Sequence, residues 1–509
     1  MPEANLHTLA RPRADVLVVG AGMGGLAAAI ELAAAGLDVA LLEAGERVGG
    51  KMGVAQVDGV EFDTGPSVLT LPDVLDDLLR RAGSPLADEL ALHAPAPSFR
   101  YLFPDGAALD VYPDAPRTLE SVAATLGAGA ADELRGFLAY ARRIWQASAP
   151  HFVYGAAPSL GALAGAGLGT LAALRHLDAW RSMRAAIRRQ VRSPQLRMLL
   201  ERYATYNGSD PRRAPATLNC IAHVELELGG YGVRGGVYEV ARALGRAAER
   251  LGTRLHFGAR VERLLLQDGR VRGVQTADGQ VWTAPAVVAN ADAAQVFERL
   301  LPPEARQRSR AEPSMSGWVG VLRARRGAPR IAHTVLFPAD YTREFADVFD
   351  RGRPPAEPTV YLCAQEAAHA RRGWAEHEPL FVMANAPAEP ERGATPAAAW
   401  AALRETVLRR LRDAALVDAD DALVFERTPA ELAAQFPGSR GGIYGAASNS
   451  PWSAFRRPPN RAPGVAGLYL ASGSAHPGGG VPLCLLSGRA AARALLADLA
   501  RAAAPARSA

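Results

Sequence analysis

The stretch from residue 15 to residue 51 constrains the fold of this chain more than any other. Residues 16–19 are a short, unbroken and mostly β-branched run, which predicts a buried parallel strand. An Ala/Leu run at 26–35 predicts a helix whose N-terminus directs free amides and a positive dipole end at an anion. Three glycines at the strand–helix junction fall on the pattern G-x-G-x-x-G: Gly20, Gly22 and Gly25. They allow a tight turn, close approach of a pyrophosphate, and close packing of helix on strand.

A second apolar run, 39–42, predicts another strand that ends at Glu43, 18 residues beyond Gly25. A carboxylate at this place accepts hydrogen bonds from an adenosine ribose and disfavours a 2′-phosphate, which argues against NADP. A lone G-x-G-x-x-G is weak evidence, because glycine-rich turns are common. Here strand, glycines, helix, second strand and acid follow in the required order, so the sequence predicts dinucleotide binding.

The composition is that of a globular protein. The chain has 509 residues, 49% hydrophobic and 21% charged, with a net charge of +5, which suits two or three domains with substantial cores. The basic excess mildly favours anionic surfaces, but no nucleic-acid-binding signature accompanies it, so we expect no nucleic-acid partner. The three cysteines are scattered, with neither metal-ligand spacing nor a disulfide framework, and we expect no metal site.

Neither a leader nor a membrane span is evident. Residues 1–14 lack the apolar core of a secretory signal, and no run approaches the ~18 apolar residues of a transmembrane helix. We therefore expect a cytoplasmic protein, either soluble or bound peripherally to a membrane face.

The next segments alternate between strand and helix patterns. Residues 55–62 alternate around an Asp58-Gly59 turn and predict a β-hairpin. The Asp63-Thr-Gly-Pro66-Ser67 stretch that follows is either an ordinary tight turn or a backbone held close to a ligand. Residues 71–82 predict an amphipathic helix, 84–115 contain short strands at 99–103 and 108–112, and 118–202 read as helical.

One part of the helical region has two interpretations. Apolar residues recur at three- and four-residue steps through 171–192, and arginines occupy the rest, which predicts one amphipathic basic helix. Such a helix can lie in the headgroup region of an anionic bilayer, or it can pack on a core with a solvated basic face. The apolar, glycine-broken segment 161–169 before it keeps the membrane interpretation open.

The rest of the chain continues the alternation of strands and helices that is typical of an α/β protein. After the Gly235-Gly236 pair we expect a helix, a strand at 254–257, a three-stranded meander from residue 260, and a buried strand at 286–290. Strands at 316–324, 359–363 and 380–384 and a helix at 397–414 suit a sheet-plus-helix substrate domain. The segment 467–482 is a strand and a glycine-dense loop, and a helix follows from about residue 485. This arrangement repeats the anion-binding arrangement of the first motif.

Four motifs together resemble the carotenoid desaturases, relatives of the flavin-containing amine oxidases. They are residues 20–51 with Glu43-x-x-x-Arg47-x-Gly-Gly-Lys51; Asp63-Thr-Gly-Pro66; Gly235-Gly236 with Asn290-Ala-Asp292; and His476-Pro-Gly-Gly-Gly-Val-Pro482, the most specific. The resemblance implies FAD rather than NAD. It also implies an α/β fold with a Rossmann-like FAD-binding domain, as in the amine oxidase/phytoene desaturase superfamily, and an inserted mixed-sheet and helical substrate domain.

The resemblance also assigns domains and residues. The FAD-binding domain is expected to take segments 1–115, 214–300 and 456–509. Residues 116–213 form a helical region that can face a membrane, and 301–455 bind substrate. His476 is the one candidate near the flavin ring, with a helix-cap role as the alternative, and we expect no general base to be required. The expected cofactor-binding residues are Gly20, Gly22, Gly24, Gly25, Glu43, Arg47, Gly49, Gly50, Lys51, Gly65, Pro66, Val261, Asn290, Gly473, Ser474, Val481 and Pro482.

Within this family the segments 441–445, 455–458 and 473–488 look most like the 1-hydroxycarotenoid 3,4-desaturases. The implied reaction moves a hydride from an apolar polyene to the flavin, with oxygen or a membrane quinone as the final acceptor. One departure is Tyr231-Gly-Val-Arg-Gly-Gly236, where many relatives have a proline. Alternatives that stay open are a phytoene or neurosporene desaturase, a carotenoid isomerase, an amine oxidase, and a non-catalytic prenyl- or polyene-binding escort protein.

Overall fold

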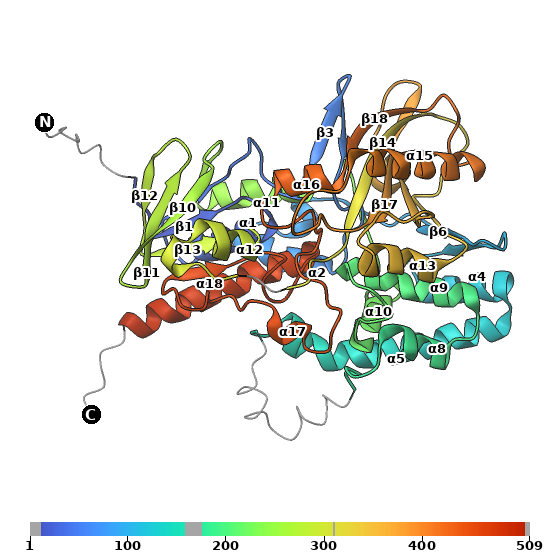
Figure 1. Cartoon of the computed structure of the whole chain (residues 1–509), viewed down its shortest axis with the longest axis horizontal. Coiled ribbons are helices and arrows are strands. Elements are labelled where there is room, and N and C mark those ends of the chain that lie inside the picture. The colour runs from blue at the N-terminus through green and yellow to red at the C-terminus, as the bar shows by residue number, and fades with distance from the viewer. Residues whose placement is uncertain (1–11, 158–175, 309–310, 504–509) are drawn as a thin grey trace, which may run out of the picture.

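Two parts of the molecule lie side by side, each built on its own large β-sheet. The computed structural model describes residues 12–157, 176–308 and 311–503. In Figure 1 the part on the left contains a parallel sheet and a small antiparallel meander. The part on the right places a larger sheet above a layer of helices.

The first sheet has five parallel strands drawn from three separate regions of the chain. Their order is β19 (Leu468–Leu470), β13 (Ala286–Ala289), β1 (Val16–Val19), β2 (Val39–Leu42) and β9 (Arg254–His256). All five were predicted as strands. The central strand β1 pairs with β2 on one side and with β13 on the other, so the two halves of the chain meet at the glycine motif.

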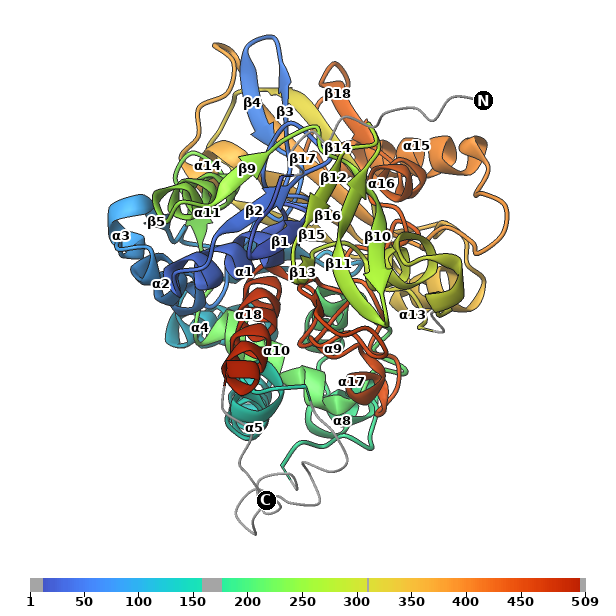
Figure 2. The same ribbon diagram turned by 90° about the vertical axis from the view of Figure 1, so that its left-hand side faces the viewer.

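Both faces of this sheet are covered, which explains why its strands are continuously apolar. Helices α1 (Met23–Ala34), α2 (Pro72–Arg81), α11 (Glu239–Arg250) and α18 (Val481–Ala503) share one core with Val16 and Val18. The predicted meander, β10 (Val261–Gln267), β11 (Arg270–Thr276) and β12 (Val281–Thr283), packs on Leu17 and Val19 from the opposite face. Figure 2 shows the helices and the meander on their two sides of the strands.

The second sheet has seven strands and mixed pairing. Its order is β18 (Ala422–Arg427), β14 (Ser316–Arg325), β17 (His377–Ala386), β16 (Val360–Ala364), β15 (His333–Leu336), β6 (Phe99–Leu102) and β7 (Ala108–Val111). Only the β15–β6 pair is parallel. Residues 99–111 therefore complete the sheet of the 301–455 region, which differs from the prediction that assigns all of 1–115 to the FAD-binding domain. The sequence predicted short strands here, but a strand pattern does not say which sheet a strand joins.

Helices cover both faces of the second sheet. Helix α15 (Ala397–Asp413) packs on one face through Trp400, Leu403 and Val407. The other face packs on the helical layer, which consists of α4 (Ala115–Leu126), α5 (Ala128–Ser148), α8 (Met183–Gln190), α9 (Pro194–Arg202) and α10 (Cys220–Leu226). This layer lies at the lower right of Figure 1.

The predicted continuous helix over 171–192 is wrong. Residues 171–175 and 161–169 lie outside the described residues, and 176–182 form turns and a bridge, so that α8 begins only at Met183. Asp178 has a φ of +50°, which an α-helix does not accommodate, and the Ser182 hydroxyl caps α8 by accepting from the amide of Ala185. Of the apolar residues in the pattern, Met183, Ile187 and Val191 are buried in the protein core, whereas Trp180 is exposed.

Shorter elements complete the fold. The hairpin β3 (Val54–Val57) and β4 (Val60–Asp63) turns at Asp58 and Gly59, both with positive φ, as predicted. The others are α3 (Leu86–Glu89), β5 (Leu92–His93), β8 (Gly232–Val233), α12 (Ala293–Gln295), α13 (Tyr341–Phe345), α14 (Gln365–His369), α16 (Pro429–Gln435) and α17 (Ser453–Arg456). In the described part of the chain, no helix has the length and apolar character needed to cross a membrane.

Candidate active site

A cavity of about 970 Å³ runs between the two sheets. At one end it is lined by the carboxyl ends of β1 and β2 and by the loop before α18. At the other end it reaches side chains of β16 and β17, among them Tyr361, Phe381 and Met383, and side chains of the helical layer such as Ile221. A ligand pocket at the carboxyl ends of parallel strands is expected for this kind of sheet.

The glycine motif forms the first wall of the cavity. Gly20, Gly22 and Gly24 line it, and α1 begins at Met23, so the unpaired amides of the first helical turn face the cavity. A Cβ on Gly22 would lie 2.5 Å from the Asn290 side-chain oxygen, so a side chain there would displace a second cavity residue. Gly25 does not line the cavity; a Cβ on it would lie 2.0 Å from the Gly20 carbonyl oxygen, which agrees with a helix–strand packing role.

Glu43 stands at the end of β2 with its carboxylate fixed. One carboxylate oxygen accepts from the backbone amide of Ala21 and the other from that of Gly45, both at 2.7 Å. Glu43 and Val261 both line the cavity. A carboxylate only accepts hydrogen bonds, so this wall suits ligand hydroxyls and repels a phosphate.

Arg47, like Gly25, is a predicted cofactor residue that does not line the cavity. Its side chain is 58% exposed, with a nitrogen 3.8 Å from Glu61, and it borders a separate shallow groove beside Tyr238 and Arg242. The neighbouring Gly49, Gly50 and Lys51 do line the cavity. Burial lowers the pKa of Lys51, an effect that Asp292 opposes.

The Asp63-Thr-Gly-Pro66 motif joins the cavity to the start of α11. Gly65 and Pro66 line the cavity, whereas Asp63 is buried behind them and accepts from the amide of Val237 at 2.7 Å. Burial raises the pKa of Asp63 to about 6, although Arg371 opposes this shift. Asp63 therefore ties the motif to the segment that follows Gly235-Gly236, a role that the sequence pattern did not reveal.

The loop before α18 forms the opposite wall. Gly473, Ser474, His476, Val481 and Pro482 all line the cavity, and α18 begins at Val481. The Ser474 hydroxyl accepts from the amide of Ala293, which connects this loop to the Asn290–Asp292 segment. The predicted residues Asn290, Gly473 and Ser474 are thus brought together with the glycine motif around one space.

His476 is almost fully buried, at 3% exposure. Its Nε2 lies 3.1 Å from the carbonyl oxygen of Gly155. Because a carbonyl oxygen only accepts hydrogen bonds, Nε2 carries the ring proton and is the donor. Burial lowers the pKa of His476, which favours a neutral ring. These contacts favour a positioning role over that of a free base.

Arg457 is a site residue to which the sequence pattern assigned no role. It is buried and lines the cavity, and it donates to the carbonyl oxygens of Gly473, at 2.8 Å, and Ala446, at 3.1 Å. Burial lowers the pKa of Arg457 to about 10. It clamps two loops of the cavity wall together, and its presence in the Phe455-Arg-Arg-Pro458 motif was the available signal.

A chain of hydrogen bonds begins immediately after Pro66. The Ser67 and Tyr361 hydroxyls lie 2.5 Å apart, and the Tyr361 hydroxyl lies 2.8 Å from Nδ1 of His333. Ser67 and Tyr361 line the cavity, whereas His333 is buried behind them, and burial holds its pKa well below its ordinary value. No sequence signal linked these residues, because they are far apart in the chain.

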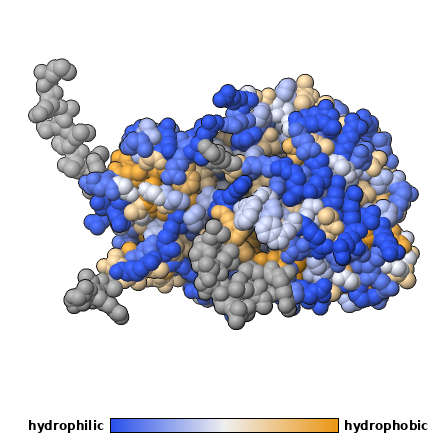
Figure 3. Space-filling model, turned by 60° about the horizontal axis from the view of Figure 1, so that its bottom comes forward, coloured by the Kyte–Doolittle hydropathy of each residue, from blue (hydrophilic) through white to orange (hydrophobic). Residues whose placement is uncertain are grey.

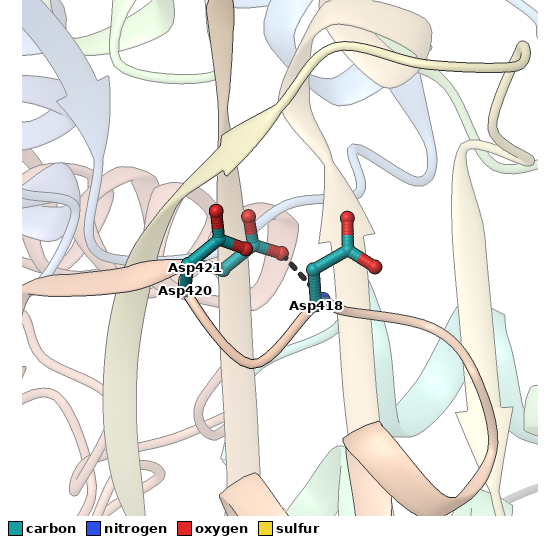
Figure 4. Close-up of side chains that lie close together, drawn as sticks. All are labelled: Asp418, Asp420 and Asp421. Atoms are coloured by element: carbon teal, nitrogen blue, oxygen red, sulfur yellow. Dashed lines mark hydrogen bonds between the residues drawn. The ribbon is translucent and has the colours of Figure 1, made fainter.

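Away from the cavity, three aspartates of the loop before β18 lie close together: Asp418, Asp420 and Asp421 (Figure 4). Asp421 accepts from the backbone amides of Asp418 and Arg325, and Asp420 pairs with the Arg325 side chain. The group is largely exposed and already has protein partners, so we assign no metal to it.

Known proteins resemble this chain over most of its length. Residues 23–323 match the family described as flavin containing amine oxidoreductase. A hydroxyneurosporene desaturase of Rhodobacter capsulatus is 37% identical over 494 residues, covering 96% of this chain and 99% of that protein. A 4,4′-diapolycopene oxygenase of a Methylomonas species is 35% identical over 495 residues, covering 95% of this chain and 98% of that protein.

Solved structures show the same fold at low identity. An oxidoreductase from Methanosarcina mazei matches with a TM-score of 0.60 and 16% identity, covering 93% of this chain and 98% of that one. Wild-type putrescine oxidase matches with a TM-score of 0.58 and 16% identity, covering 96% and 99%.

The cavity residues fit the cofactor of this family. The open N-terminus of α1 suits a pyrophosphate, the fixed carboxylate of Glu43 suits a ribose, and the cavity continues to a second helix N-terminus at Val481. The chain therefore belongs to the flavin-containing amine oxidoreductase family, in its carotenoid desaturase branch, and is an FAD-dependent oxidoreductase.

Proposed function

We propose that this enzyme forms the 3,4 double bond of an acyclic carotenoid that carries a hydroxyl or methoxy group at C1. The observation that carries the proposal is the single cavity that joins the glycine motif to an apolar wall of Phe381, Met383 and Ile221. A polyene needs such a dry, apolar enclosure beside the cofactor. The identity to hydroxyneurosporene desaturases, which extends over nearly the whole chain, supports the choice of substrate.

FAD would be held by the predicted residues that line the cavity. When bound, it accepts a hydride from one carbon of the saturated bond, while a proton leaves the neighbouring carbon. Gly22 and Gly24 would face the pyrophosphate, Glu43 the ribose, and Gly65 and Ser474 the far end of the cofactor. His476 would hold the loop before α18 in place by its bond to Gly155, and we propose no obligatory general base.

We also propose that the enzyme binds membranes peripherally at the mouth of the cavity. Trp180 and Trp452 are 77% and 46% exposed, line the cavity, and lie edge to face at 5.7 Å. Tyr154, 40% exposed, packs on the cavity residue Trp145. Exposed Trp and Tyr side chains favour the bilayer interface, and Figure 3 shows hydrophobic residues gathered in a hollow near the middle of one face.

We propose the cavity mouth at Trp180 and Trp452 as the membrane contact, in place of the basic helix expected over 171–192. Of the arginines in the 171–192 pattern, Arg184 and Arg188 pair with the buried Glu201, and Arg181 pairs with Asp178. Their charge is therefore partly neutralised within the protein.

The decisive experiment supplies purified flavoprotein with a 1-hydroxy acyclic carotenoid or with phytoene, in liposomes containing a quinone or equilibrated with oxygen. We expect the hydroxylated compound to give a product lighter by two hydrogen atoms with a red-shifted spectrum. Efficient conversion of phytoene alone would instead support a phytoene or neurosporene desaturase, and a product of unchanged mass an isomerase.

Other outcomes point to the remaining alternatives. A product heavier by oxygen would support the chemistry named for the 4,4′-diapolycopene oxygenase relative. Oxidation of an amine would support an amine oxidase, and polyene binding by a colourless protein would support an escort. Comparison of the two liposome preparations identifies the electron acceptor.

A further inference from the structure

Arg202 is a buried cation at the cavity wall. It is the last residue of α9 and only 8% exposed, yet it lines the cavity. Four aromatic rings surround its guanidinium carbon with centroids at 5.0 to 5.8 Å, those of Phe99, Tyr101, Tyr206 and Tyr361. These rings attract the cation through their faces.

The hydrogen-bonding capacity of Arg202 is largely unused. A guanidinium carries five N–H donors, and here Nη1 donates to the hydroxyls of Tyr206, at 2.9 Å, and Tyr101, at 3.4 Å. In residues 12–157, 176–308 and 311–503, no carboxylate lies within 4.0 Å of Arg202 and no hydrogen bond joins its Nε or Nη2. A buried arginine with spare donors at a cavity wall is arranged to receive an acceptor.

The nearby acid Glu225 limits what that acceptor can be. Glu225 is 5% exposed, accepts a hydrogen bond from the Tyr203 hydroxyl at 3.0 Å, and acts electrostatically on Arg202. Its field opposes that of the guanidinium. The site therefore suits an uncharged oxygen better than a carboxylate.

Arg202 lies close to the part of the cavity proposed to hold the reacting end of the flavin. Its guanidinium carbon is 5.8 Å from the ring of Tyr361, whose hydroxyl bonds Ser67, the residue after Pro66. The mouth residues Trp180 and Trp452 instead contact each other, and Trp452 also contacts Phe455. A substrate oxygen at Arg202 would thus place the carbons next to it near Pro66.

We propose that Arg202, supported by Tyr206, is the specificity-determining subsite for the uncharged oxygen at the end of the polyene, whether hydroxyl, ether or carbonyl. This inference rests on the proposed function and names how the substrate is recognised. The oxygen accepts from the free guanidinium N–H groups, and the surrounding rings contact the carbons beside it. A hydrocarbon end would leave those donors buried and unpaired, which is the basis of rejection.

The test uses two closely matched tyrosines. Tyr206 and Tyr203 have ring centroids 5.4 Å apart and both are enclosed in the protein, but only Tyr206 lines the cavity and bonds Arg202. Tyr206→Phe and Arg202→Met are compared with the control Tyr203→Phe, each as FAD-loaded full-length protein with flavin content checked. Binding of a polyene with a terminal hydroxyl and of the same polyene without it is followed by quenching of tryptophan fluorescence.

We expect the wild-type enzyme and Tyr203→Phe to prefer the hydroxylated polyene by roughly 10- to 100-fold. Arg202→Met should abolish this preference, chiefly by weaker binding of the hydroxylated compound, and Tyr206→Phe should reduce it several-fold. A preference that survives in both variants, or that the wild type lacks, overturns the proposal. So does an Arg202-dependent preference for a polyene carboxylate over the alcohol. If the binding preference is intact but no substrate is converted, the result contradicts the proposed desaturase function and leaves the role of Arg202 standing.

Discussion

The side-chain nitrogen of Lys51 lies 2.6 Å from the carbonyl oxygen of Gly442, although 391 residues separate the two in the chain. Lys51 ends the glycine-rich segment that follows Glu43, and Gly442 belongs to the loop that supplies Ile443 and Tyr444 to the cavity. The bond connects the two parts of the molecule at the cavity. This bond therefore joins two segments of the cavity wall that are distant in the chain.

Replacement of Gly22 by valine should yield apoprotein. A Cβ there would lie 2.5 Å from the Asn290 side-chain oxygen and would intrude where the pyrophosphate approaches. We expect loss of the visible flavin spectrum. Gly136→Ala is the control, because Gly136 lies in α5 with no atom within 4 Å of a new Cβ. A Gly22→Val protein that purifies with full flavin would show that the pyrophosphate lies elsewhere.

Replacement of Arg457 by methionine should loosen the loop before α18. The variant leaves the carbonyl oxygens of Gly473 and Ala446 without their donors, at a cost of about 1–3 kcal/mol for each buried group. We expect a lower unfolding midpoint and faster release of flavin. Arg456→Met is a neighbouring control, because Arg456 is exposed. Equal flavin release from both variants would contradict a clamp.

The exposed tryptophans of the mouth should govern vesicle binding. Trp180→Ser with Trp452→Ser should weaken binding by on the order of 1 kcal/mol for each side chain, because each inserts only in part. The measurement is co-flotation with anionic vesicles. Phe257→Ser is the control, because Phe257 is 44% exposed but borders the other groove. Flotation that resists the double substitution would exclude the mouth as the contact.

Glu344 should make stability depend on pH. Burial raises the pKa of Glu344 to about 7, although hydrogen bonds from Thr359 and Asn385 lower it in part. Its contribution to the free energy of unfolding is therefore greatest below its ordinary pKa of 4.5 and falls as the pH rises. Above about pH 7 the full cost of the buried charge, about 3 kcal/mol, is present.

Glu344→Gln should remove this dependence. Between about pH 5 and pH 8, the urea midpoint of the variant should fall less steeply than that of the wild type. Glu405→Gln, at an exposed position beside Arg404, should follow the wild type. Parallel curves for all three proteins would show that Glu344 does not titrate in this range.

Local signals predicted most of the fold. The strand at 16–19, the Asp58-Gly59 turn and the helix opened by Pro72 each depend on residues that are adjacent in sequence, and the structure contains all three. The helix over 171–192 failed for a related reason. Apolar spacing does not require a continuous helix: Leu177 and Met183 are buried and share the spacing across a break at Asp178, and Trp180 between them is exposed.

The two walls of the cavity differ in how far they could be predicted. The glycine motif and Glu43 lie within one stretch of chain, so their spacing alone placed them together. Arg202 and Tyr361 come from distant segments whose approach depends on the pairing of the seven-stranded sheet. Arg47 belongs to the same stretch, but its spacing did not reveal that its side chain lies opposite Glu61 and outside the cavity, and its contact with the cofactor stays a prediction.

The pairing of β1 with β13, and of β13 with β19, has a consequence during synthesis on the ribosome. The glycine motif emerges early, but β19, the outer neighbour of β13, and the loop of Gly473 and Ser474 emerge only near residue 470. A nascent chain therefore exposes an unpaired parallel strand edge until then, a state prone to misassociation. A flavin that contacts the wall formed by Gly473 and Ser474 is therefore enclosed only after these residues have emerged.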